Sequence, residues 1–217
     1  YDHAISQDAP SAAPYLYRGI AVIHLGSYNE ALEALDRALS LQKDYPEAFY
    51  YQGVTYLRLE RYEDAITAFN HALELNDRYT EAYHHKGIAL ARTGDYDASI
   101  VAFDAALGIH PENEDALYER GRALMHSGKN EEAIASFDLA LTFSPGYANA
   151  VYEKGRALFS LGNPDAAISA FERALEMNPA CNQAIFWKGR AFFEMGNFED
   201  AIRAFEHAIE NNHRTAD

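Results

Sequence analysis

Cysteine, basic residues and long apolar runs are all scarce in this sequence, and each scarcity excludes a class of protein. The single cysteine, Cys181, cannot form an internal disulfide or a cysteine-rich zinc site. No apolar run approaches the roughly 18–20 residues that cross a bilayer. Because residues 1–11 also lack a basic segment followed by an apolar core, no signal peptide is expected. We therefore expect a cytoplasmic protein.

Positive charge is also in short supply. Eighteen lysines and arginines stand against 33 acidic residues, and the net charge is −15. A phosphate backbone or an anionic membrane surface would be repelled before local contacts could form. Neither a nucleic acid nor a membrane is therefore expected as a partner. Basic or apolar protein surfaces are easier to accommodate.

What the sequence does contain is a strict repeat with a period of 34 residues. A glycine opens the pattern, a small residue follows 12 positions later, a large apolar residue comes four beyond it, and an alanine comes three beyond that. The glycines are Gly19, Gly53, Gly87, Gly121, Gly155 and Gly189. The large apolar residues are Leu35, Phe69, Phe103, Phe137, Phe171 and Phe205. Six units in register without an insertion indicate a repeat protein.

Each unit is predicted to contain two helices. Apolar residues lie four before and three after each glycine, as in Phe49, Gly53 and Tyr56, which places them on one helical stripe. A break follows the first helix, and Gly26 and four later glycines mark it, whereas Glu60 occupies this place in the second unit. The second helix is expected to start at residues that cap helices, namely Ser27 in a capping box with Glu30, Asp95 and Asn197, and at Asn163-Pro164, which puts proline at the first helical position. Small residues let the two helices cross closely, so neighbouring units should stack into a solenoid.

This pattern resembles the tetratricopeptide repeat (TPR) family, with glycine at repeat position 8, a small residue at 20, an aromatic at 24, alanine at 27 and proline at 32. The resemblance implies an all-α, right-handed α-solenoid of helix-turn-helix units. The predicted repeats span residues 12–45, 46–79, 80–113, 114–147, 148–181 and 182–217, the last including a short tail. Residues 1–11 are predicted to be the second half of a truncated preceding repeat, because Tyr1, Ala4 and Ile5 fall at its positions 24, 27 and 28.

The resemblance also implies where a partner would bind. In TPR proteins the first helices line a concave groove, into which repeat positions 2, 5, 6, 9, 12 and 13 point. Carried onto this chain, the motif gives a groove with an apolar first half and a second half that carries an arginine ladder. The candidate residues are Tyr17, Tyr50, Tyr51, Val54, Leu57, His84, Ile88, Tyr118, Arg122, Tyr152, Arg156, Phe186, Trp187 and Arg190.

Two interpretations of the ladder remain open at this level. Arg122 and Arg156 could bind carboxylates or carbonyl groups of a partner. Alternatively, Glu119 and Glu153 lie three residues before them, which is the spacing of ordinary ion pairs within a helix, and Tyr118 and Tyr152 could stack on the same arginines. A lysine, arginine or glutamine at position 7 of every repeat is expected to lay its stem on apolar surface and keep its head in water.

The function predicted from these features is that of a protein-interaction scaffold that holds a peptide or helix of another protein. The alternative is self-association through the terminal repeats or the groove. The chaperone-binding type of TPR groove is not expected, because Leu16 and Ile20 stand where its carboxylate clamp has lysine and asparagine. No cofactor, metal site or catalytic group is predicted, since the glycines belong to the repeat and the adjacent His84 and His85 diverge around a helix.

Overall fold

The computed structural model describes residues 11–214, including side chains up to Asn211. The predicted half-repeat in residues 1–11 falls almost entirely outside these residues. Within the described chain every element is an α-helix, and no strand occurs. The all-α fold of helix-turn-helix units predicted from the sequence is confirmed.

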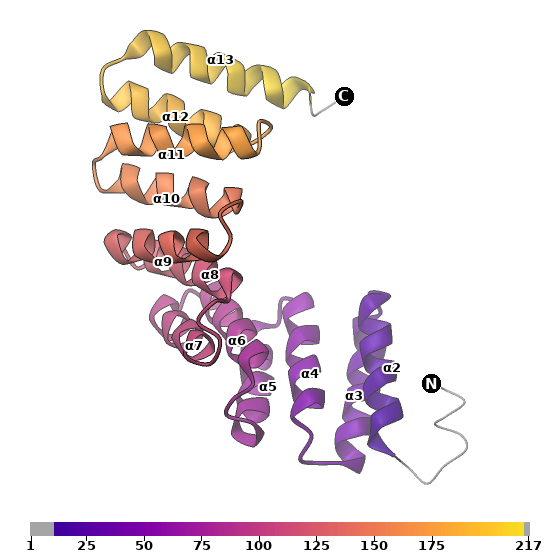
Figure 1. Cartoon of the computed structure of the whole chain (residues 1–217). Helices are drawn as coiled ribbons and strands as arrows, with labels where there is room; N and C mark the ends of the chain where they lie inside the picture. Colours follow the sequence, from indigo (N-terminus) through magenta and orange to yellow (C-terminus); the bar gives the residue numbers. More distant parts are fainter. Residues whose placement is uncertain (1–10, 215–217) are drawn as a thin grey trace. The chain divides into compact units, whose positions relative to one another are not determined.

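Contacts divide the chain into two compact units, residues 1–111 and 112–217. In the first unit the described helices are α2 (Ala12–His24), α3 (Tyr28–Leu41), α4 (Pro46–Arg58), α5 (Tyr62–Leu75), α6 (Thr80–Thr93) and α7 (Tyr96–Ile109). In the second they are α8 (Glu114–His126), α9 (Asn130–Phe143), α10 (Ala148–Ser160), α11 (Pro164–Met177), α12 (Asn182–Glu194) and α13 (Phe198–Arg214). The described part of each unit holds three helical hairpins, which can be followed along the chain in Figure 1.

The small residues of the repeat allow the two helices of each hairpin to pack closely. A Cβ atom added to Gly53 would lie 2.5 Å from Cε1 of Phe69, whose side chain is completely buried. The same contact with the position-24 phenylalanine recurs at Gly87, Gly121, Gly155 and Gly189. The alanines at position 27 are likewise buried in every repeat. Any larger residue at position 8 would push the helices apart.

The helix starts agree with the sequence in three of the four predicted cases. The Asp95 side chain accepts a hydrogen bond from the Ala98 amide at 3.1 Å, and Asn163 and Asn197 cap their helices in the same way. The capping box predicted at Ser27 is wrong, because no side-chain cap is formed there.

The head groups of three position-7 side chains link successive repeats, and the two lysine ion pairs among them remain partly exposed to water. Lys188 Nζ on α12 lies 2.7 Å from Glu172 Oε1 on α11, and Lys154 pairs with Asp138 in the same way. Gln52 donates to Asp36 across the equivalent interface in the first unit. Each contact joins position 7 to the residue 16 places earlier, at position 25 of the preceding repeat. The polar heads thus link one repeat to the next.

The first helices lie on the inner side of each unit. Helix α4 contacts both α2 and α6, and α10 contacts both α8 and α12, so neighbouring first helices touch. Within each unit, no described second helix contacts the second helix of the next repeat. Since the first helices are closer together than the second helices, each unit curves with its first helices on the concave face. The positions that could meet a partner are therefore presented there.

Candidate functional site

The concave faces contain three pockets that occupy equivalent places in the repeat. Each lies between two neighbouring first helices and is lined by positions 12 and 13 of one repeat and positions 6, 9 and 13 of the next. The Leu57 pocket is lined by Val54, Leu57, Arg58, Glu60, Tyr62, His85, Ile88 and Arg92. The Arg122 pocket is lined by Arg122, Met125, His126, Asn130, Glu153, Arg156 and Ser160. The Trp187 pocket is lined by Phe159, Ser160, Gly162, Pro164, Trp187, Arg190 and Glu194.

The three pockets differ in size and in chemistry. Their volumes are about 330 Å³ for the Leu57 pocket, 180 Å³ for the Arg122 pocket and 490 Å³ for the Trp187 pocket. The first has an aliphatic floor, the second is dominated by charged groups, and the third has aromatic walls. Repetition of one geometry with different side chains is what an extended ligand with several unlike anchors requires.

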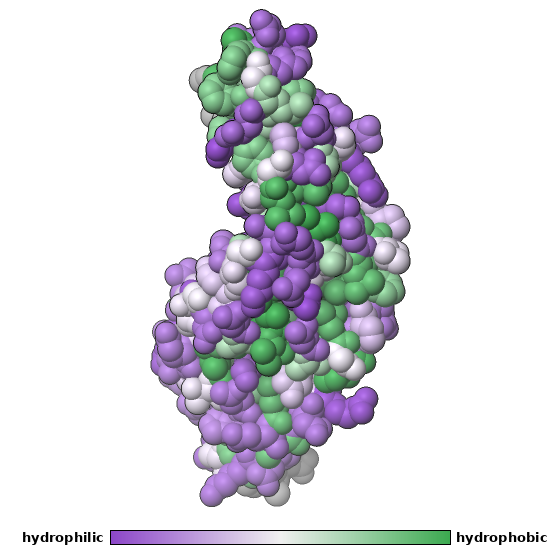
Figure 2. All heavy atoms as spheres, turned by 90° about the vertical axis from the view of Figure 1, so that its left-hand side faces the viewer, coloured by the Kyte–Doolittle hydropathy of each residue, from purple (hydrophilic) through white to green (hydrophobic). Residues whose placement is uncertain are grey.

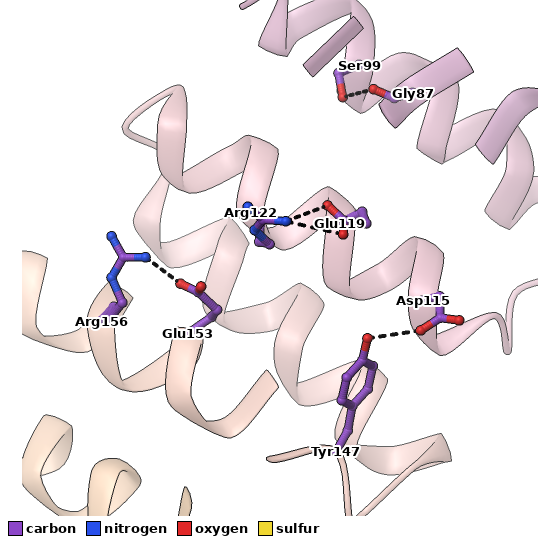
Figure 3. A network of polar contacts seen from close by, with 8 residues as sticks. All are labelled: Gly87, Ser99, Asp115, Glu119, Arg122, Tyr147, Glu153 and Arg156. Atoms are coloured by element: carbon purple, nitrogen blue, oxygen red, sulfur yellow. Dashed lines mark hydrogen bonds and ion pairs between the residues drawn. The ribbon is translucent and has the colours of Figure 1, made fainter. Parts of the chain in front are cut away.

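The arginines that line the Arg122 pocket already form ion pairs within their own helices. Arg122 Nη1 lies 3.1 Å from Glu119 Oε2, and Arg156 Nη1 lies 2.9 Å from Glu153 Oε2, as Figure 3 shows. Glu153 is 8% exposed, so its charge depends on Arg156 for compensation. The interpretation of these arginines as partners of intrahelical ion pairs is therefore confirmed.

The predicted stacking of the ladder on tyrosine holds for only one of the two arginines. The Arg122 guanidinium lies 5.8 Å from the ring centroid of Tyr118. Arg156 instead lies 5.2 Å from the ring centroid of Trp187, on the next first helix, so the stacking predicted for Tyr152 is wrong. Trp187 is the larger and more electron-rich ring, which makes it the better partner for a guanidinium.

Several planar side chains, aromatic rings and a guanidinium group, lie close together in the Trp187 pocket. Arg190 lies 5.1 Å from the ring centroid of Trp187 and 5.4 Å from that of Phe159. The Phe159 and Trp187 rings are 5.5 Å apart and meet edge to face. Trp187 takes the place that Glu119 and Glu153 hold in the two preceding repeats, so Arg190 lacks the acidic neighbour three residues earlier. Its donors are consequently available to a ligand.

The tyrosines at position 5 are packed against the core. Tyr50, Tyr118 and Tyr152 each lie 6.0–6.1 Å, between ring centroids, from the buried phenylalanine of their own repeat. Burial raises the pKa of each of the three hydroxyls to about 12. Tyr118 also stacks on Tyr147, whose hydroxyl donates to Asp115 Oδ1 at 2.9 Å (Figure 3). These rings support the concave face from below and line none of the three pockets.

The His85 side chain is held in a similar way beneath the Leu57 pocket. Its Nδ1 lies 2.9 Å from the carbonyl oxygen of Glu81 and therefore carries the hydrogen, since a carbonyl can only accept. Burial lowers the pKa of the imidazole below its usual value, with the charge of Arg58 acting in the same direction. The neighbouring His84 instead meets the Phe103 ring at 5.7 Å and lines none of the three pockets described above.

The predicted site residues thus separate into two groups. Those that line the three pockets are Val54, Leu57, Ile88, Arg122, Arg156, Trp187 and Arg190. Those that do not are Tyr17, Tyr50, Tyr51, His84, Tyr118, Tyr152 and Phe186. Tyr17 is 51% exposed on α2, and Phe186 turns toward Phe205 and Ile209 at a separate cavity beside α13.

Among the pocket-lining residues that the candidate set omits are Arg58, Arg92 and Phe159. All three stand at positions 12 or 13, which the family pattern already directs into the groove, so a reading of these two positions in every repeat would have found them. Within the described chain, no three histidine, cysteine or carboxylate side chains gather as a metal site. Nor does any described helix combine the length and the apolar character needed to cross a bilayer.

The comparisons with known proteins agree on the repeat. A sequence profile described as tetratricopeptide repeat matches residues 18–82, 85–148 and 152–216. No curated protein sequence matches the chain. Among solved structures, "YrrB: a TPR protein with an unusual peptide-binding site" is 23% identical with a TM-score of 0.75, covering 85% of this chain and 95% of the other.

Two further structures are similar. MamA from Desulfovibrio magneticus RS-1 is 23% identical with a TM-score of 0.74, over 78% of this chain and 96% of MamA. PilW, described as a type IV pilus biogenesis factor, is 19% identical with a TM-score of 0.78, over 89% of this chain and 90% of PilW. At these identities the likeness concerns the fold.

Proposed function

The chain belongs to the tetratricopeptide repeat family, and from that premise we propose that it is a protein-interaction scaffold that holds a segment of a partner protein along its concave faces. The single observation that carries the proposal is the recurrence of one inter-helix pocket at equivalent repeat positions, with different linings. TPR proteins bind other proteins or peptides, and YrrB is described as having a peptide-binding site.

The residues that line each pocket indicate which side chains of a partner segment it would bind. Aliphatic anchors suit the floor formed by Val54, Leu57 and Ile88, while flat or anionic groups suit Phe159, Trp187 and Arg190. The Arg122 pocket offers less, because its arginines already hold Glu119 and Glu153. The partner is therefore expected to make its main contacts on α4 and α6 in one unit and on α10 and α12 in the other.

Comparative capture tests this proposal. The wild type is compared with a groove variant carrying Leu57→Ala and Trp187→Ala, and with an outer-face variant carrying Val101→Ala and Leu139→Ala. Val101 and Leu139 lie on second helices and are 67% and 44% exposed, so their truncation leaves the pockets intact. Tyr50 and Tyr152 are avoided because they pack against buried phenylalanines.

A partner that is retained by the wild type and the outer-face variant but lost by the groove variant supports the proposal. Equal retention by all three proteins, with circular dichroism showing that each is folded, would contradict it. Loss from the outer-face variant alone would move the binding surface to the second helices.

A specific observation also favours self-association as a second function. The last helix, α13, exposes Phe198, Ile202 and Ile209 at 53%, 56% and 57%. Figure 2 shows hydrophobic residues interspersed among hydrophilic ones on one face of the molecule. Exposed apolar side chains grouped on one helix are typical of an interaction surface. Sedimentation velocity over a concentration series tests this idea: Ile202→Glu with Ile209→Glu should abolish association, and a wild type that stays monomeric would refute it.

A further inference from the structure

The Leu57 pocket carries two arginines that have no carboxylate partner in the described chain. Arg58 ends α4, Arg92 lies near the end of α6, and both stand at position 13 of their repeats and are exposed. Within residues 11–214, neither guanidinium forms an ion pair or a hydrogen bond, unlike Arg122 and Arg156. In a chain of net charge −15, two such arginines at one pocket leave a local positive site.

The pocket between them is suited to an aliphatic side chain. Its floor is formed by Val54 and Leu57 on α4 and by Ile88 on α6, and its volume is about 330 Å³. Burying one leucine or isoleucine side chain there would contribute about 1.5–3 kcal/mol. Beneath the floor, His85 is kept neutral by burial, which lowers its pKa, so it adds no charge to the pocket at neutral pH.

The pocket is also the place where the chain departs from its own repeat. Glu60 stands in the turn where the five other repeats have glycine, and its φ is 58°, the only positive φ of a non-glycine residue in the described chain. A side chain in this conformation costs about 1–2 kcal/mol. Backbone strain of this kind is concentrated at functional sites. Glu60 lines the pocket and supplies its single negative charge, against two positive charges.

We propose that the Leu57 pocket recognises a short acidic-aliphatic segment of the partner: an aliphatic side chain enters between α4 and α6, and a neighbouring carboxylate is bound by Arg58 or Arg92. This inference rests on the proposed function and specifies the partner's chemistry at one pocket. Arginine suits the task because its planar fork of donors binds a carboxylate with two hydrogen bonds. The two positive charges of Arg58 and Arg92 disfavour a basic residue at the same place, which adds discrimination against the wrong segment.

A displayed library of random dodecapeptides tests the proposal and requires no identified partner. Peptides selected on the wild type should be enriched in aspartate or glutamate within two residues of leucine, isoleucine or valine. For a synthetic peptide of that selected sequence, Arg58→Gln with Arg92→Gln should lower the affinity at least tenfold in low salt. The affinity for the wild type should also fall as salt is raised, since exposed charges are screened. The matched control, Arg173→Gln at an exposed position on the second helix α11, should change the affinity less than twofold.

The outcomes separate this inference from the function on which it rests. If the selected peptides lack acidic residues, the ionic recognition is wrong and groove binding stands. The same conclusion follows if the arginine double variant binds as well as the wild type while Leu57→Ala weakens binding. If neither Leu57→Ala nor the arginine variant weakens binding, both are wrong at this pocket. A library that enriches no peptide overturns both, because a groove for extended segments has to select some sequences. Arg58 and Arg92 are exposed, so both variants should retain the wild-type melting temperature.

Discussion

Substitution of the position-8 glycine by alanine tests the close helix packing that the repeat pattern requires. In Gly53→Ala, the new Cβ would lie 2.5, 2.7 and 2.8 Å from three ring carbons of Phe69. Carbon atoms normally approach to about 3.5–4.0 Å, so the ring or the helix has to move by roughly 1 Å. The ring is fully buried and cannot turn into solvent. The strain therefore falls on the crossing of α4 and α5.

The expected cost follows from two opposing terms. Overpacking a well-filled core costs about 1–3 kcal/mol. Replacing glycine by alanine inside a helix returns about 0.8–1 kcal/mol. We expect Gly53→Ala to lower the free energy of unfolding by up to about 2 kcal/mol. Gly108→Ala in α7 is the matched control, because nothing lies within 4 Å of its added Cβ, and it should be neutral or stabilise by up to about 1 kcal/mol.

Urea unfolding followed by circular dichroism measures both variants, with the slope of the free energy against urea checked for constancy. A double variant with Phe69→Leu locates the strain: the Phe69→Leu substitution should cost less in the Gly53→Ala background than in the wild type, with a coupling of at least about 0.5 kcal/mol. If Gly53→Ala and Gly108→Ala stabilise the protein equally, the close-crossing explanation of the 34-residue pattern is refuted.

Three further substitutions have expected outcomes in the same unfolding assay. Glu60→Gly should raise the free energy of unfolding by about 1 kcal/mol, because it removes a positive-φ side chain, and an unchanged value would show that the turn is unstrained. Asn163→Ala should lower it by about 0.5–2 kcal/mol through loss of the cap on the Ala166 amide, whereas Ser27→Ala, whose side chain forms no cap, should change it little. The pKa of His85 is lowered in the folded protein, so the unfolded chain takes up the proton first as the pH falls, and stability should be lost below pH ~6.5. His85→Gln should remove this loss. A wild type that is equally stable at pH 5 and pH 7.5 would contradict the expectation.

The fold could be predicted almost completely from the sequence, because the residues that let two helices pack closely recur with the period of the sequence. The pair of positions that Gly53 and Phe69 occupy recurs every 34 residues. Because each pair packs in one way, the period determines the helical hairpin and its stacking. The differences between prediction and structure are local. Ser27 has the right residue type for a cap but forms none, and Lys188 pairs with Glu172, a partner that the pattern did not indicate because it lies 16 residues earlier, in the preceding repeat.

The candidate site is harder to predict, since a repeat position fixes where a residue stands but not which neighbour its side chain meets. Arg156 and Arg190 share position 9, yet only Arg156 has a glutamate three residues earlier to hold it. Tyr50 is predicted in the groove, but its ring packs on Phe69. Which groove residues remain free for a ligand depends on such pairings, and those between helices, such as Tyr50 with Phe69, do not follow from the period.

Photo-crosslinking of a captured partner tests most directly whether the first helices hold it. A benzophenone amino acid is placed at Leu57 or Phe159 on the concave faces, and at Val101 or Leu139 on the second helices, one site in each protein. We expect crosslinks to the partner from Leu57 and Phe159 and none from the two outer positions. Crosslinks from Val101 or Leu139, with none from the concave positions, would contradict the account.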